Sequence, residues 1–174
     1  MGIQFETDYN METLTAMAKG LRKTVRRKRS RRVQIFAAVV LVLGILTILA
    51  TVAGGESLGA SGVVTLLALL VVILATVFED RLNAWFARKR LLPGTEHAAA
   101  TFEEDGYVSA TGVTESRFSY AQIVAVAETA RYFVFALSSH HTQAYDKRTI
   151  RGGSVEDFRA FIAEKTGKPI ANIK

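Results

Sequence analysis

The sequence predicts a membrane α-helical hairpin of two transmembrane helices joined to a small α+β domain, in which antiparallel strands form a barrel closed by a C-terminal helix. Three observations lead to this fold class. Two long apolar runs lie close together, at 33–53 and 60–78. Basic residues gather just before the first run and just after the second. From residue 95 onward, apolar residues alternate along short segments, as in strands, until a last stretch with helical spacing.

Each apolar run is long enough to cross a bilayer. The runs hold 21 and 19 residues, and as helices they are roughly 30 Å long, which matches the hydrocarbon core. Between them lies GGESLG at 54–59, and its Glu56 is the one charged residue from 33 to 78. A soluble domain of 174 residues has no shell that covers both runs. We therefore expect transmembrane helices at 33–53 and 60–78, with 54–59 as an external loop.

A cleaved signal peptide is the alternative for the first run. Residues 1–32 form a much longer basic flank than such peptides carry, and a second apolar run follows directly. The charge distribution then orients the hairpin. Residues 1–32 carry nine bases against three acids, and 79–94 carry four against two, whereas the loop between the runs has no base. By the positive-inside rule, both ends of the chain lie in the cytoplasm.

Residues 1–32 are expected to form a cytoplasmic arm with an amphipathic helix. Asn10 has the character of an N-cap, and apolar residues recur after it at three- and four-residue steps. Such a helix would lie on the leaflet or pack on the domain. Its basic end either contacts anionic lipid headgroups or acts only as a topology signal. The candidate lipid contacts in this arm are Arg22, Lys23, Arg26, Arg27, Lys28, Arg29, Arg31 and Arg32.

Residues 79–94 are expected to continue the second transmembrane helix to about Leu92, because Pro93-Gly94 would stop it. An indole near a span end is typical of the membrane interface, and neighbouring cations are attracted to anionic headgroups. The candidate lipid contacts here are Trp85, Arg88, Lys89 and Arg90.

Residues 95–174 are expected to form the domain, a small α+β barrel or sandwich of five or six antiparallel strands with one C-terminal helix. Asp105-Gly106 stands between two half-apolar segments and predicts a tight hairpin. Further strands are predicted up to Glu128, over 132–137 and over 142–146, with a turn near Thr129. Ser154 and Asp157 have capping-box spacing, so a helix should begin there and end near Gly167.

The layout resembles the YcxB-like family of bacterial membrane proteins. The resemblance depends on three segments: FSYAQIVAVAETARYFVF, AYDKRTIRGG and EDFRAFIAEK. It implies a bacterial cytoplasmic membrane protein whose domain is like a small pleckstrin-homology (PH) barrel, and it supplies no catalytic signature. PH domains that bind inositol phosphates do so through a basic first hairpin loop. Here that turn reads Glu103-Glu104-Asp105-Gly106, which would repel phosphates.

The sequence offers no constellation for catalysis. Nucleotide-binding glycine loops, HExxH and GxSxG are missing, and the chain has no cysteine. His140 and His141 are adjacent and would point to opposite faces of a strand, so they make a poor metal site. We expect neither enzyme activity nor a cofactor. The basic pI of about 9.8 comes from the membrane flanks rather than from a nucleic-acid surface, because 95–174 is nearly neutral.

The leading functional hypothesis is therefore an integral membrane protein that presents a cytoplasmic PH-like interaction or regulatory module to a protein partner. A subunit of a small oligomeric channel or transporter, and a sensor of anionic lipid, are the alternatives. Two spans bury little surface, so a homo-oligomer or a membrane partner is also expected. Glu128, at the end of an apolar strand, should pair with Arg131 or Lys147. The candidate partner surface comprises Glu128, Lys147, Arg148 and Arg151.

Overall fold

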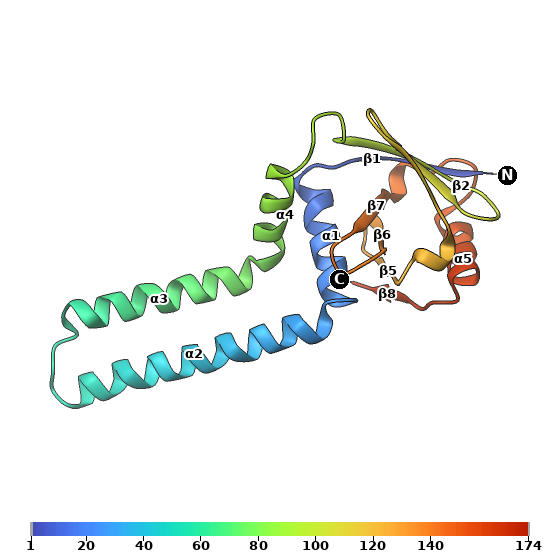
Figure 1. Ribbon diagram of the computed structural model, residues 1–174. Helices are drawn as coiled ribbons and strands as arrows, with labels where there is room; N and C mark the ends of the chain where they lie inside the picture. Colours follow the sequence, from blue (N-terminus) through green and yellow to red (C-terminus); the bar gives the residue numbers. More distant parts are fainter. Residues whose placement is uncertain (1, 174) are drawn as a thin grey trace.

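The computed structural model describes residues 2–173 and consists of a long helical hairpin attached to a domain of strands and helices (Figure 1). Met1 and Lys174, the outer ends of the expected arm and domain, lie outside the described residues. The two apolar runs form antiparallel neighbours that project away from the domain. The helices are α1 (Met11–Lys23), α2 (Arg27–Ala53), α3 (Gly59–Val77), α4 (Glu79–Lys89) and α5 (Val155–Thr166).

The domain contains two four-stranded sheets. In the first, neighbouring strands are antiparallel in the order β1-β2-β3-β4. In the second, with the order β7-β6-β5-β8, the last strand runs parallel to β5 and the other pairs are antiparallel. The strands are β1 (Ile3–Asp8), β2 (His97–Phe102), β3 (Tyr107–Thr111), β4 (Glu115–Phe118), β5 (Ala125–Glu128), β6 (Tyr132–Ala136), β7 (Thr142–Asp146) and β8 (Ile170–Asn172).

The expected closed barrel is wrong, because the two sheets do not join into one ladder. Between residues 2 and 173, β1 meets the segment after β7 through the isolated bridge between Gln4 and Arg151 and through hydrogen bonds of Thr149 Oγ1 with the backbone of Glu6, not through a strand ladder. Aromatic side chains fill the space between the sheets, and α5 covers it through Phe158, so the core is sealed without a continuous ring of strand pairs. The antiparallel strands and the C-terminal helix themselves are confirmed.

The second sheet is buried on both faces. Val126, Phe133 and Phe135 point into the aromatic core, while the alternating Ala127 and Val134 belong to a second cluster. Helix α1 covers that second face, with Ala16 and Met17 packed against the cluster. Gly20 of α1 comes so close that a Cβ there would lie 2.7 Å from Val134 Cγ1. The amphipathic helix thus packs on the domain, one of the two expected placements.

The segment before α1 also belongs to the domain. Strand β1 pairs with β2 over its full length, from Ile3 with Phe102 to Asp8 with His97. Phe5 is 1% exposed and lies in the aromatic core. Residues 3–23 are therefore part of the folded unit that the sequence placed at 95–174, and the hairpin is an insertion between α1 and β2.

Helices α2 and α3 are exposed around most of their circumference. Large apolar side chains such as Leu43, Val64 and Val71 are 59%, 65% and 64% exposed, so these helices are not the core of a soluble domain. Both are long and apolar enough to cross a membrane. At Gly44 the two helices lie so close together that a Cβ there would be 2.6 Å from Leu69 Cδ2.

The second apolar helix does not continue straight to Leu92 as expected. It ends at Val77, and after the break at Phe78 the chain turns into α4, which runs beside α1 (Figure 1). The turn brings Ala84, which is 0% exposed, to the contact with α1 and sets Asp80 opposite Arg22. These long-range contacts fix the direction of α4, which local helix signals cannot predict.

Candidate functional site

A bidentate ion pair fastens the base of the hairpin to the domain. Arg22 of α1 donates to both carboxylate oxygens of Asp80 on α4, at 2.7 Å from Nε and 2.6 Å from Nη2. Glu79 lies 3.8 Å from the same guanidinium. The hydrogen bond to Asp80 raises the pKa of Arg22. The sequence predicts Arg22 as a lipid contact, and the structure instead commits it to an ion pair inside the protein.

Arg26 forms a second tie between the hairpin base and the domain. Its Nε donates to the backbone carbonyl of Ser139 at 2.7 Å, and its Nη2 lies 2.9 Å from Nδ1 of His140. Both partners belong to the turn between β6 and β7. The other predicted lipid contacts of the arm form no ion pair within residues 2–173: Lys23, Arg27, Lys28, Arg29, Arg31 and Arg32.

Helix α4 carries two exposed aromatic side chains. Trp85 and Phe86 are 44% and 51% exposed, and their rings meet edge to face at 5.0 Å between centroids. Lys89 Nζ lies 3.7 Å from the centre of the Trp85 ring. Arg88 and Arg90 are exposed beside them. The structure therefore brings the four predicted interfacial residues together at one end of the hairpin.

Glu128, itself buried, lies at the centre of an ionic cluster. Its carboxylate accepts hydrogen bonds from Arg159 at 2.7 and 2.8 Å and from Lys147 Nζ at 2.6 Å. The hydrogen bond from Arg159, followed by the one from Lys147, lowers the pKa of Glu128 to about 2 against the opposing effect of burial. The predicted pairing with Lys147 is confirmed, and the alternative with Arg131 is wrong.

Arg131 pairs instead with the buried Asp146 and with Glu12 of α1. The distance from Arg131 Nη2 to Asp146 Oδ2 is 2.8 Å, and Glu12 accepts from Nη1. Asp146 also accepts from the exposed Arg148. Arg151 is exposed and lies 3.5 Å from Glu6 of β1. Of the predicted partner surface, Glu128 and Lys147 therefore line the inner cluster, while Arg148 and Arg151 lie outside it.

Arg159 is a member of the cluster that the sequence analysis does not identify. It lies on α5 and reaches Glu128 across 31 positions of sequence. The capping-box serine at 154 sets the start of this helix, and its apolar residues Phe158 and Ile162 set the buried face. A charged residue next to that face could have been identified as a candidate partner for a buried acid at the end of β5.

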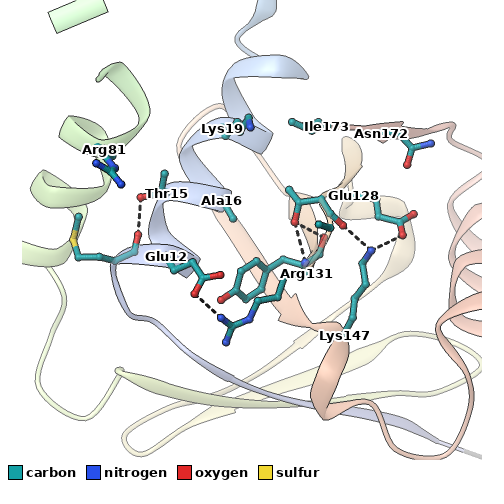
Figure 2. A pocket seen from close by; sticks show the side chains of 14 residues that line it. Glu12, Thr15, Ala16, Lys19, Arg81, Glu128, Arg131, Lys147, Asn172 and Ile173 are labelled. Carbon is teal, nitrogen blue, oxygen red and sulfur yellow. Dashed lines mark hydrogen bonds and ion pairs between the residues drawn. The ribbon is translucent and has the colours of Figure 1, made fainter. Parts of the chain in front are cut away.

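A groove of about 1120 Å³ opens between α1, α4 and the turn from β5 to β6 (Figure 2). Its apolar walls include Met11, Ala16 and Ile173. Lys19 and Arg81 line it without an ion pair within the described part of the chain, and Figure 2 draws both without an interaction partner. The lining also contains two further bases, Arg131 and Lys147, and two acids, Glu12 and Glu128. The four bases and two acids give the lining a formal charge of +2.

The hairpin carries few polar side chains. Thr47, Thr51 and Thr65 donate to carbonyls four residues earlier in their own helices, at 2.9 to 3.0 Å. Between residues 2 and 173, the structure contains no group of three or more His, Asp and Glu side chains that could hold a metal ion.

Comparison with protein families gives a match to part of the chain. Residues 102–162 match the family model described as YcxB-like protein. This segment runs from the end of β2 to α5 and includes Glu128, Lys147 and Arg159, so it covers the ionic cluster. The match confirms the resemblance drawn from the sequence, and two apolar helices precede it. Comparisons with curated proteins and with solved structures found no match.

Proposed function

We propose that this chain is a multi-pass protein of a bacterial plasma membrane that presents a PH-like module to a protein partner, without catalysis. In this proposal α2 and α3 cross the bilayer, and both ends of the chain lie in the cytoplasm. The exposed apolar surface of the two helices and the basic residues at the base of the hairpin support this placement. Two sheets packed under a C-terminal helix support the PH-like description.

The observation that carries the proposal is the firm joint between the hairpin and the domain. Strand β1 pairs with β2, and α1 packs on the second sheet. Arg22 of α1 forms an ion pair with Asp80 of α4. The hairpin is thus held to the domain on both sides of its insertion, rather than tethered by one flexible linker. A module of this kind keeps its surfaces at a fixed height and orientation above the membrane.

The groove between α1, α4 and the β5–β6 turn is the proposed partner site. Its two acids are neutralised by ion pairs, whereas Lys19 and Arg81 are uncompensated in the described chain. The lining also includes the apolar side chains of Met11, Ala16 and Ile173. The partner that fits this chemistry is an extended protein segment with acidic and apolar residues, because the acids complement the two cations and the apolar residues cover the walls.

Site-specific photocrosslinking in intact cells tests this proposal. A benzophenone side chain at Thr15, in the groove, is expected to give a discrete protein adduct, whereas the same probe at Glu164 on the outer side of α5 gives none. Adding Arg81→Glu should reduce the Thr15 adduct at least about fivefold, because it replaces an attractive charge by a repulsive one.

The control for charge is Arg88→Glu, which makes the same change on α4 outside the groove. This variant should leave the adduct unchanged. The partner-site proposal is wrong if Thr15 and Glu164 give the same adducts, or if Arg88→Glu and Arg81→Glu have equal effects.

A further inference from the structure

A second hollow lies where α1 leads into α2, next to the domain. It is open to solvent, has a volume of about 650 Å³, and lies between this connection, β5, the β6–β7 turn and the segment that enters β8. Three cations line it: Lys23 at the end of α1, Arg27 at the start of α2, and Lys168 from the segment between α5 and β8. The tie from Arg26 to Ser139 holds the β6–β7 turn against the connection. We call this hollow the basal pocket.

The basal pocket has an uncompensated positive charge. None of the described residues that line it is Asp or Glu. Lys23, Arg27 and Lys168 take part in no ion pair between residues 2 and 173, unlike the cations around Glu128 and Asp146. Like charges held around one space repel one another, so an anion placed among them would stabilise the arrangement.

The position of the basal pocket matches the headgroup layer of the proposed membrane. Arg27 is the first residue of α2, and the apolar run begins six residues later at Val33. At 1.5 Å per residue the pocket lies about 9 Å before the apolar run, which is where headgroups lie. Val25 and Val124, 39% and 49% exposed, also line the pocket and offer apolar contacts.

Hydroxyl groups complete the lining. Ser138 Oγ accepts the backbone N–H groups of His140 and His141 at 3.1 and 3.0 Å, which leaves its own hydrogen available for donation. Ser139 also lines the pocket. Ammonium, guanidinium and hydroxyl donors around one space are the donor set that phosphate oxygens accept from.

We propose that the basal pocket binds the phosphate headgroup of an anionic phospholipid. The inference rests on the proposed membrane placement and names a ligand for the hairpin base. Lys23 and Arg27 approach the phosphate from the membrane helix side, and Lys168 approaches from the domain. A bound headgroup therefore bridges the domain and α2, and anionic lipid strengthens the joint that Arg22 and Asp80 make on the other side.

The test uses the full-length protein purified in an uncharged detergent and titrated calorimetrically with short-chain lipids. Dioctanoyl phosphatidylglycerol is expected to bind, dioctanoyl phosphatidylcholine to bind at least about tenfold more weakly, and glycerol phosphate to bind more weakly than the lipid. Lys168→Glu should weaken phosphatidylglycerol binding by about tenfold or more, since each basic group near a headgroup contributes about 1 kcal/mol.

The matched control is Lys165→Glu, which makes the same charge change on α5, three positions before Lys168, at a side chain that does not line the basal pocket. It should change the affinity by less than about twofold, because its charge lies outside the pocket and is screened by solvent. Equal losses in the two variants would overturn the proposal in favour of general attraction between charges. If glycerol phosphate binds as tightly as phosphatidylglycerol, the pocket recognises a free phosphate group, and the proposal that its ligand is a lipid is wrong.

Folding and membrane insertion are checked separately. The near-UV circular dichroism spectrum of Lys168→Glu should be the same as that of the unsubstituted protein. If the spectra differ, Lys168→Gln is used in place of Lys168→Glu, and its affinity for phosphatidylglycerol is expected to fall about fivefold. The protein should stay in the membrane through an alkaline wash. Extraction by that wash would contradict the proposed function, whereas retention without phosphatidylglycerol binding would contradict only the headgroup site.

Discussion

Replacing Phe158 by alanine is expected to destabilise the domain by about 3–5 kcal/mol, because the substitution removes a whole ring from a fully buried core. The ring is 0% exposed and lies where α5 covers both sheets. Its centroid is 4.6 Å from Phe5 and 4.8 Å from Phe102 in the first sheet, and 5.0 Å from Phe133 in the second. Truncation leaves a cavity where α5 packs against both sheets.

The measurement is thermal unfolding of the full-length protein in detergent, followed by near-UV circular dichroism. Phe158→Leu, which keeps most of the volume, should lose less stability than Phe158→Ala. Phe86→Ala provides the control, because that ring is 51% exposed on α4 and should change the midpoint little. A Phe158→Ala midpoint equal to that of Phe86→Ala would contradict the described core.

Replacing Glu128 by glutamine is expected to cost about 2–3 kcal/mol at neutral pH. The carboxylate is 7% exposed and forms ion pairs with both Lys147 and Arg159. The amide removes the negative charge and leaves the ammonium group of Lys147 partly buried without a counter-ion. The exposure of Arg159, at 39%, limits the loss because water can replace its contact.

The same substitution should change how stability depends on pH. The folded-state pKa of Glu128 is about 2, below its ordinary value of 4.5. The stabilisation is therefore fully present above about pH 4.5 and is lost as the pH falls from there towards 2. The difference in unfolding free energy between the protein and Glu128→Gln should accordingly shrink over this range. Glu164→Gln on α5 is the control, and a difference that stays constant from pH 7 to 3 would contradict the ionic cluster.

Local signals predict many of the elements. Ser154 caps α5 with Asp157 as its reciprocal partner, and Gly167 ends the helix in the left-handed conformation. The Asp105-Gly106 turn joins β2 to β3, and β7 has the bounds that the alternation predicts. These elements are set by spacing and capping within about a dozen residues, so no tertiary contact is needed to identify them.

Features that depend on distant contacts are not predictable in this way. The partner of β1 is β2, some 90 positions away, because the hairpin is inserted between them; the alternation of Phe5 and Thr7, 1% and 3% exposed, is its only local signal. The break at Phe78 depends on α1, and the pairing of Glu128 with Arg159 depends on where α5 crosses the second sheet. The closed barrel fails for a related reason: alternation indicates a buried face but not which strand edges join.

The placement of the hairpin loop and the domain on opposite sides of the lipid core can be tested most directly by labelling single cysteines. The chain has no cysteine of its own, so each introduced thiol is unique. Glu56→Cys, in the loop between α2 and α3, should react with a membrane-impermeant maleimide on intact cells, whereas Glu164→Cys on α5 should react only after the membrane is permeabilised. Labelling of Glu164→Cys on intact cells, or protection of Glu56→Cys there, would contradict the account.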